Sequence, residues 1–341
     1  MDIKFELLIP NRNVQEQEII IKIDMSNYQI QYINGQTSLP LANSEKQISF
    51  QDFIYKIIKE KKSNGNLRTA EAYQSALNSF NRFIQDRPMP LNEIDCIVME
   101  DYEAYLKKTS VCMNTVSFYM RIIKAVYKRA VSLKMITDNS PFKNVYTGVA
   151  KTRKRALDVN TIRQIKSLSL IDDEERLARD LFLFSFYTRG MSFVDMAFLQ
   201  KKDVNNGLLT YKRRKTGQLI TVKWESAMQE IVDNLHSYND TYLLPIIKRV
   251  GHNERSQYKY MQYMVNKSLN TVGKRLMLPC VLTMYVARHS WASIAKSADV
   301  PLSIISEAMG HSSEKMTRIY LKSMDEWKIH YENERVINLV Q

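Results

Sequence analysis

Four stretches in the first half of the chain repeat apolar residues at intervals of three and four positions, the spacing of one helix face. Thr69 and Asn114 are of the residue types that begin helices, and we predict them as N-caps. The predicted helices are 50–61, 69–85, 98–107 and 114–134. Since Pro141 closes the series, residues 48–147 are predicted to form one helical domain.

Residues 1–47 show a different pattern. The segments 18–23 and 28–33 have the composition of strands, and the second alternates apolar and polar residues. This segment has four Lys and Arg against six Asp and Glu. It is predicted to be a small β-rich segment, with either a protein-contact role or a DNA-binding role.

The second half of the chain contains both patterns, the helical spacing of three and four positions and the alternation typical of strands. Helices are predicted from Thr161 and over 172–186, and the segment 187–196 is a turn leading into a further helix. Residues 208–211 and the alternating apolar positions after 219 predict a hairpin. The chain is therefore mainly α with small β-sheets, and residues 156–341 form its second large domain.

Composition adds the kind of partner. The 341 residues carry a net charge of +13, which favours a polyanion, either nucleic acid or an anionic membrane surface. No apolar run approaches the roughly 20 residues that span a bilayer. The three cysteines have no metal-ligand spacing, and the start of the chain lacks the features of a signal peptide. We therefore predict a cytoplasmic protein that binds nucleic acid, with no metal, no cofactor and no membrane.

The excess positive charge gathers in three places. The predicted helix 114–134 has Arg121, Lys124 and Lys128 opposite its apolar face. This stripe follows a phosphate backbone or is an ordinary solvated face, and both interpretations stay open. The other two places are a basic linker, 148–155, and the tip of the hairpin predicted after residue 208. Their candidate DNA-binding residues are Lys151, Arg153, Lys154, Arg155, Arg213 and Arg214.

Near the C-terminus lies a group of residues able to hold and attack a phosphate. Arg288 stands in Ala287-Arg288-His289-Ser290, and His311 and Tyr320 follow in that order. With the Lys215-Thr216-Gly217 hairpin before them, these motifs resemble the tyrosine recombinase (phage integrase) family over roughly residues 48–325. The first half resembles the family's SAM-like core-binding domain, and the second half its α+β catalytic domain.

The resemblance implies a reaction. Members of the family cut DNA by attack of a tyrosine on a phosphodiester, forming a 3′-phosphotyrosyl intermediate without metal or ATP. By position, Tyr320 is the implied nucleophile, Arg288 the second arginine, His311 a hydrogen-bond donor and Lys215 the hairpin lysine. An arginine suits the task because its guanidinium stays charged and donates two parallel hydrogen bonds to phosphate oxygens.

Two positions depart from the family pattern. Ser192 stands where the family has its first arginine, as in the integrases of bacterial conjugative transposons that the segment 188–193 resembles. Arg189, three residues earlier, is our predicted substitute if a helix extends back that far. Tyr285 stands where the family has a histidine, and its phenol is predicted to donate a hydrogen bond.

The predicted function is site-specific recombination on double-stranded DNA with paired sites, by a homotetramer in the bacterial nucleoid, with or without accessory DNA-bending proteins. The apolar tail after Tyr320 packs on a neighbouring protomer or on its own domain. Two alternatives stay open. Ser192 and Tyr285 suggest a catalytically weak or inactive DNA-binding relic. A type IB topoisomerase would use the same chemistry without paired sites.

Overall fold

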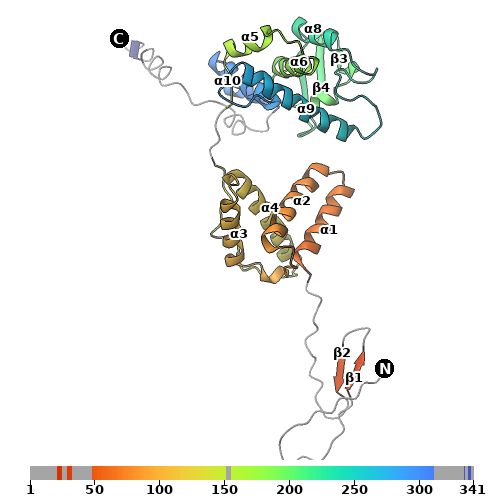
Figure 1. The fold of residues 1–341 in the computed structure, drawn as a ribbon, viewed down its shortest axis with the longest axis vertical. Helices are drawn as coiled ribbons and strands as arrows, with labels where there is room; N and C mark the ends of the chain where they lie inside the picture. Colours follow the sequence, from red (N-terminus) through yellow and green to blue (C-terminus); the bar gives the residue numbers. More distant parts are fainter. Residues whose placement is uncertain are drawn as a thin grey trace, which may run out of the picture. The chain divides into compact units, whose positions relative to one another are not determined.

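The computed structural model describes residues 21–24, 29–32, 48–150, 155–310, 334 and 337–338 (Figure 1). Backbone contacts divide the chain into two units, Met1–Lys151 and Thr152–Gln341. Each unit has a large hydrophobic core of its own. Within the part of the chain that the structure describes, no helix is both long and apolar enough to cross a bilayer.

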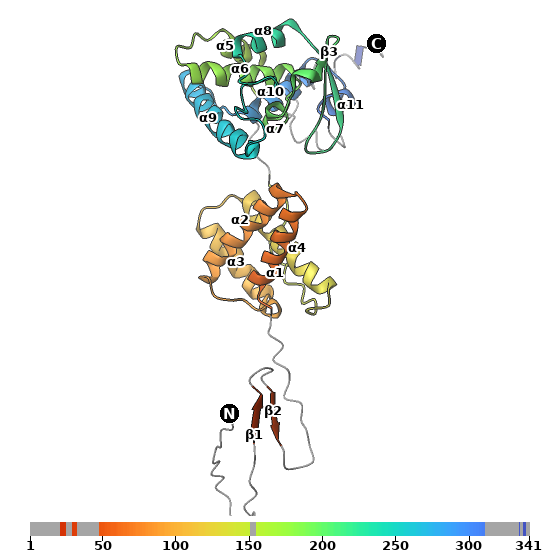
Figure 2. The ribbon, with the colours of Figure 1, turned by 90° about the vertical axis from the view of Figure 1, so that its right-hand side faces the viewer.

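The first unit contains the four predicted helices. They are α1 (Phe50–Ser63), α2 (Leu67–Ile84), α3 (Cys96–Lys108) and α4 (Met113–Ser132), with a 3-10 turn, η1 (Leu91–Glu93), between α2 and α3. The helix α1 packs along α2, and α4 contacts both α2 and α3 (Figures 1 and 2). The periodicity therefore predicted all four helices to within a few residues at each end.

Aromatic rings fill the centre of this helical unit. The Phe80 ring meets Phe50 and Tyr102 edge-on, with ring centroids 5.2 and 5.1 Å apart. The buried Tyr102 hydroxyl donates a hydrogen bond of 2.8 Å to Ser79 Oγ, and burial raises the Tyr102 pKa. The polar atoms that the aromatic packing brings inside are thus paired with one another.

The predicted N-caps of two helices are wrong. Thr69 lies inside the first turn of α2, which begins after Asn66, and α4 begins after Cys112. Asn114 bonds instead to the chain that leaves the unit. Its side chain accepts from Ala150 N at 2.8 Å and donates to Ala150 O at 3.0 Å. A polar side chain near a helix start thus pairs with distant backbone, which sequence patterns do not show.

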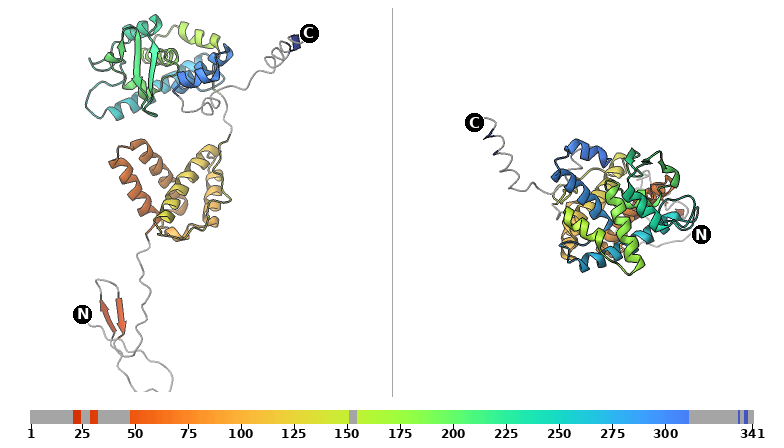
Figure 3. Two further views of the ribbon diagram at one scale, coloured as in Figure 1. Left: turned by 180° about the vertical axis from the view of Figure 1, so that it is seen from behind. Right: turned by 90° about the horizontal axis from the view of Figure 1, so that it is seen from above.

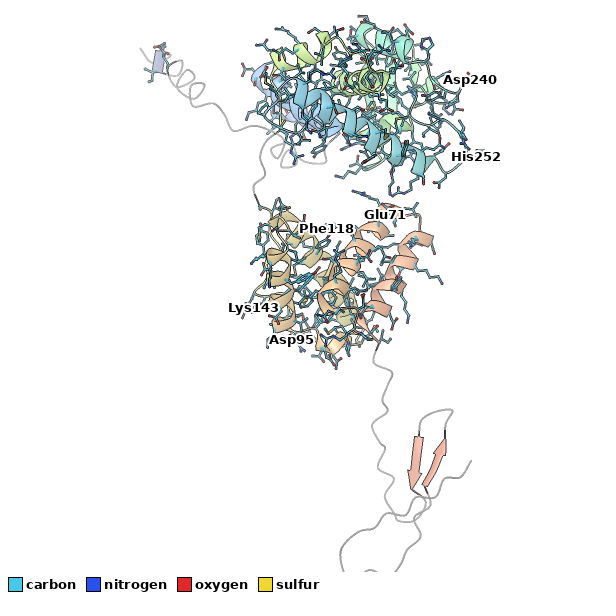
Figure 4. The ribbon with its side chains drawn as sticks, viewed as in Figure 1. Glu71, Asp95, Phe118, Lys143, Asp240 and His252 are labelled. Atoms are coloured by element: carbon cyan, nitrogen blue, oxygen red, sulfur yellow. The ribbon has the colours of Figure 1, made fainter. Side chains whose placement is uncertain are left out.

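The exit of the chain therefore lies beside the start of α4. Ser117 strengthens this attachment by donating to Gly148 O at 2.6 Å. Figure 4 shows Glu71 of α2 and Phe118 of α4 at one end of the helical unit, and Asp95 and Lys143 toward the opposite end. The segment that leads to the basic linker begins at the end marked by Phe118.

Of residues 1–47, the structure describes two strands, β1 (Ile21–Asp24) and β2 (Gln29–Tyr32). They pair antiparallel, with Ile21 opposite Tyr32 and Asp24 opposite Gln29. The two strands predicted from the pattern of this segment are confirmed, and their ends differ by a few residues.

The second unit is built around the long apolar helix α6 (Asp173–Tyr187), which contacts α5, α8, α9 and α10. Asp172 is its N-cap and accepts from Glu175 N at 2.9 Å. Figure 3 shows the same unit from behind, with its small sheet beside the helices. The other helices are α5 (Val159–Ser167), α7 (Phe193–Ala197), η2 (Lys201–Asp203), α8 (Ser226–Leu235), α9 (Glu254–Arg275), α10 (Met284–Ser297) and α11 (Leu302–Ala308).

The sheet has the order β3-β4-β5 and is antiparallel throughout. Its strands are β3 (Val204–Asn205), β4 (Leu208–Lys212) and β5 (Leu219–Lys223). The predicted hairpin is confirmed, with Tyr211 opposite Ile220. Both of these side chains are buried in the core of the unit, and the residues after Lys212 form the turn that carries Lys215.

Candidate active site

Arg288 lies in the second turn of α10 and is 5% exposed. Its guanidinium is held by two main-chain carbonyls that come from different parts of the chain. Nη1 donates to Gly190 O at 2.8 Å, and Nη2 donates to Met309 O at 2.6 Å. The α6–α7 turn and the end of α11 therefore fix this arginine from two sides.

Gly190 is required where it stands because Arg288 packs against its backbone. Its φ is +76°, and a Cβ added there would lie 2.6 Å from Arg288 Cα. Both the backbone angle and the lack of space exclude a side chain at this position. The glycine thus allows the carbonyl of residue 190 to come within hydrogen-bonding distance of the arginine.

Gly190→Ala should destabilise the second unit strongly. The left-handed backbone costs an alanine about 1–2 kcal/mol, and relieving the contact with Arg288 brings the total to about 3 kcal/mol or more. For a unit of this size, the melting temperature should fall by roughly 6–12 °C, as circular dichroism would measure.

Gly207→Ala is the matched control for this substitution. Gly207 has a similar φ of +70°, but no atom lies within 4 Å of an added Cβ. The free energy of unfolding should therefore fall by no more than about 1–2 kcal/mol in Gly207→Ala. Equal melting temperatures for the two variants would show that the contact with Arg288 does not constrain residue 190.

Arg213 is a second buried arginine at the same place. It follows β4, is 7% exposed, and donates through Nη1 to the carbonyl of Gly310. Our prediction placed Arg213 at an exposed hairpin tip facing DNA, and the structure corrects that placement. The residue lies where β4 leaves the sheet, so its side chain turns inward toward the end of α11.

The two arginines therefore bind the carbonyls of neighbouring residues. Arg288 holds Met309, Arg213 holds Gly310, and residue 311 follows directly. Gly310 has a φ of +63°, and an added Cβ would lie 2.7 Å from Ile220 Cδ1. The backbone just before His311 is thus fixed by two guanidinium groups and by close packing against β5.

The charges at this place act on Tyr211, a buried residue of β4. Burial raises the pKa of the Tyr211 phenol most, and the carboxylate of Asp195 raises it further. The positive charges of Arg288, Arg213 and Arg189 oppose this effect. The phenol of Tyr211 is therefore neutral, and three arginines lie near enough to one point to influence it.

Arg189 is not on a helix, so the structural reason for our prediction is wrong. The helix α6 ends at Tyr187, and Arg189 has a φ of +61° in the turn that follows. The next helix, α7, begins at Phe193 with Ser192 as its N-cap. Arg189 is half-buried, and its Nη1 donates to Thr221 O of β5 at 3.3 Å.

The other candidate residues of this unit lie at the surface. Lys215 is exposed in the turn between β4 and β5. Tyr285 is in the first turn of α10, 53% exposed, with its ring centroid 4.7 Å from that of His289. Arg155 is exposed, and its carbonyl accepts a weak bond from Cys280. Arg214 is exposed too, but its contacts hold it against α7.

The predicted basic stripe of α4 is partly neutralised. Lys128 forms an ion pair of 2.5 Å with Asp138, and the Lys124 ammonium lies 6.0 Å from the centroid of the Phe142 ring. Arg121 is exposed, with its Nε donating to Ser117 O at 3.3 Å. Arg121 thus remains the strongest of the three candidates for contact with a phosphate backbone.

Five predicted site residues lie outside the described part of the chain. They are Lys151, Arg153 and Lys154 of the linker, and His311 and Tyr320 near the C-terminus. Their roles stay predictions. Among the residues that the structure describes, no group of three or more His, Cys, Asp and Glu side chains is arranged to bind a metal ion.

The sequence analysis missed Asp195, which is 4% exposed and joins two parts of the site. Its Oδ2 accepts from Ser192 Oγ at 2.6 Å, and its Oδ1 accepts from Arg214 N at 2.9 Å. The spacing of serine and aspartate, three residues apart, is a known start signal of helices. That signal would have placed the start of α7 at Ser192 and excluded Arg189 from the helix.

Two protein-family models and a curated relative match the chain. Residues 49–147 match the model of the phage integrase SAM-like domain, and residues 157–326 match that of the phage integrase family. The tyrosine recombinase XerC of Leptospira interrogans serovar copenhageni is 21% identical over 263 residues, 76% of this chain and 84% of that protein.

Solved structures show the same fold. The Tn1549 transposon integrase, in complex with a circular intermediate DNA, has a TM-score of 0.64 at 16% identity and covers 84% of this chain and 99% of its own. A lambda integrase dimer bound to a core site has a TM-score of 0.60 at 15% identity, and the match covers 80% of this chain and 95% of the lambda chain. A lambda integrase tetramer bound to a Holliday junction also has a TM-score of 0.60, at 14% identity, and the match covers 90% of this chain and 94% of the lambda chain.

A SAM-like helical unit followed by a phage integrase catalytic unit defines a class of enzymes that cut and rejoin DNA strands. The chain belongs to the phage integrase family and is a tyrosine recombinase.

Proposed function

We propose that this recombinase acts on paired sites in double-stranded DNA through a 3′-phosphotyrosyl intermediate at Tyr320. One observation carries the proposal. Two buried arginines, Arg288 and Arg213, bind the carbonyls of Met309 and Gly310, immediately before His311. Buried guanidinium groups fixed by main-chain carbonyls form a rigid positive site, which suits the pentacoordinate phosphate of a transition state.

Arg213 takes the place of the family's first arginine in this proposal. The serine at position 192 is used as a helix cap and bonds to Asp195, so it offers no positive charge. Arg213 supplies that charge from the adjacent hairpin, close to the backbone that Arg288 also holds. Because a guanidinium has five N–H donors, the bond to Gly310 uses only one of them.

In the proposed cleavage step, Tyr320 takes the place of the 5′ oxygen on phosphorus. Tyr320 Oη forms a bond to phosphorus while the bond from phosphorus to the 5′ oxygen breaks. The ammonium group of Lys215 gives a proton to that oxygen and becomes a neutral amine, and the phenol proton of Tyr320 passes to solvent. His311 and Tyr285 donate hydrogen bonds to the non-bridging oxygens. Attack by the 5′ hydroxyl of a partner strand reverses the step.

The partners of this recombinase are duplex DNA and further copies of the chain. The net charge of +13, with Arg121 and Arg155 exposed, supports binding to duplex DNA. The lambda integrase neighbour forms a tetramer on a Holliday junction, and we extend that assembly to this chain. We place the protein in the bacterial cytoplasm at the nucleoid. It needs no cofactor, and accessory DNA-bending proteins assist where the paired sites lie far apart.

A nicked suicide substrate tests this function. In such a duplex, the short strand released by cleavage diffuses away, so rejoining fails and the covalent complex accumulates. The wild-type protein should form an adduct that survives denaturant and heat, and peptide mapping should place the DNA on Tyr320. DNA binding without any adduct, under all conditions, would instead identify an inactive relic of a recombinase.

A further inference from the structure

The turn between β4 and β5 is fixed at its base. Arg213 N donates to Gln218 O, and Gly217 N donates to Arg213 O, both at 2.8 Å. The side chain of Arg213 is buried against Gly310. Lys215 lies in the middle of this turn and is exposed. Its four-carbon stem is flexible, so the position of its ammonium group depends on how firmly the backbone beside it is held.

Arg214, the residue before Lys215, is attached at two points, to Asp195 of α7 and to Phe198, the C-cap residue of that helix. Its main-chain N–H donates to Asp195 Oδ1 at 2.9 Å. Its guanidinium carbon lies 3.8 Å from the centroid of the Phe198 ring. A guanidinium at this distance from a ring face is attracted by the electrons of the ring. The backbone of Arg214 is thus bound to α7, and its side chain to the residue that caps the end of this helix.

Both attachment points are themselves rigid. Asp195 is buried and also accepts from Ser192 Oγ at 2.6 Å. The Phe198 ring meets those of Tyr242 and Tyr258 edge-on, with centroids 6.0 and 5.6 Å apart. Arg214 therefore rests on a buried carboxylate and on a cluster of three aromatic rings, of which Tyr242 is in the core of the second unit and the other two pack against that core.

We propose that Arg214 is a positioning residue that holds Lys215 where it protonates the 5′ oxygen. The inference rests on the proposed function, because it assumes Lys215 as the general acid. Our sequence-based prediction gave Arg214 a direct contact with DNA. The guanidinium lies on Phe198, and that contact accounts for an arginine here without DNA.

A chemical substitution in the DNA separates these two roles. In a 5′-phosphorothiolate substrate, sulfur replaces the 5′ bridging oxygen at the scissile bond. Attack by Tyr320 then breaks the phosphorus–sulfur bond, and the thiolate leaves without receiving a proton because thiols are far more acidic than alcohols. A defect confined to proton donation should therefore disappear on this substrate, whereas a defect in DNA binding should persist.

The experiment compares single-turnover cleavage of the oxygen and sulfur substrates at saturating protein. Lys215→Ala should lose about 10²–10³-fold on oxygen and regain nearly wild-type rates on sulfur. Arg214→Ala should lose about tenfold or more on oxygen and stay within about threefold of wild type on sulfur. Phe198→Leu, which removes the ring but keeps an apolar side chain, should show a smaller loss of the same kind.

Two further variants complete the set. Arg214→Lys keeps a cation able to lie over Phe198 and should recover most of the lost rate. Lys212→Ala removes an exposed positive charge from the same hairpin and should leave the ratio of the two rates unchanged. A melting curve for each variant shows whether the fold is intact.

The outcomes distinguish the two levels of the proposal. If Lys215→Ala is not rescued by sulfur, the assignment of Lys215 as the acid fails, and with it this inference. If sulfur rescues Lys215→Ala but not Arg214→Ala, only the positioning role fails. Weaker DNA binding by Arg214→Ala, with equal losses on both substrates, would identify Arg214 as a DNA contact.

Discussion

Arg213→Ala should lower the rate of strand cleavage by about 10³-fold, as expected when an arginine that stabilises the charge of a phosphoryl transition state is removed. Arg213 is the buried arginine whose guanidinium donates to the carbonyl of Gly310, the residue before His311. Its loss removes positive charge from a site where little water screens it, so the effect falls on the chemical step.

The measurement is single-turnover cleavage of the suicide substrate. DNA affinity should change by less than about tenfold, since many other phosphate contacts hold the duplex. Arg213→Lys keeps the charge but not the planar fork of donors, so it should recover only part of the rate. A melting curve controls for the lost bond to the Gly310 carbonyl.

Arg189→Ala is the comparison that decides which arginine replaces the one missing at Ser192. Arg189 is only half-buried, and its Nη1 bonds to Thr221 O rather than to the backbone near His311. We expect a loss of less than about tenfold, typical of a residue that supports the site from outside. A larger defect for Arg189→Ala than for Arg213→Ala would reverse the assignment.

Tyr320→Phe should abolish the covalent adduct completely while leaving DNA binding intact. Phenylalanine retains the ring but lacks the oxygen that attacks phosphorus, so no bond to DNA forms. The assay is the same suicide substrate followed by denaturing electrophoresis, with a mobility shift under native conditions to measure binding.

The 19 tyrosines of the chain make a matched control necessary. Tyr285→Phe removes a hydroxyl from a 53% exposed ring in the same unit. It should lose no more than about tenfold in rate, the share of one hydrogen bond, and still form the adduct. An adduct that persists in Tyr320→Phe would show that another residue is the nucleophile.

Much of the fold could be predicted because it follows from local periodicity. Apolar residues three and four apart marked all four helices of the first unit, and alternation marked the pairing of β4 with β5. Helix boundaries were less accurate at Thr69 and Asn114. Thr69 lies inside the first turn of α2, and the Asn114 side chain bonds to the backbone of Ala150 instead of capping its own helix.

The candidate site also has a part that could be predicted from the sequence and a part that only the structure shows. The sequence by itself determined the order and spacing of Lys215, Arg288, His311 and Tyr320, because motif residues are set by the chemistry of the phosphate. Our proposal for the arginine that replaces the first one depended on the tertiary structure. Arg189 is close to Ser192 along the chain, yet the turn at Gly190 directs it to β5.

Arg213 is 21 residues from Ser192 in sequence, but packing of the hairpin against the end of α11 brings it to Gly310. The sequence also could not separate Arg213 from Arg214, since both are basic residues in one turn. Within that turn the two side chains take different directions, since Arg213 is buried against Gly310 and Arg214 lies over Phe198. Residue types thus indicated the kind of chemistry, and long-range packing decided which arginines lie together beside Gly310.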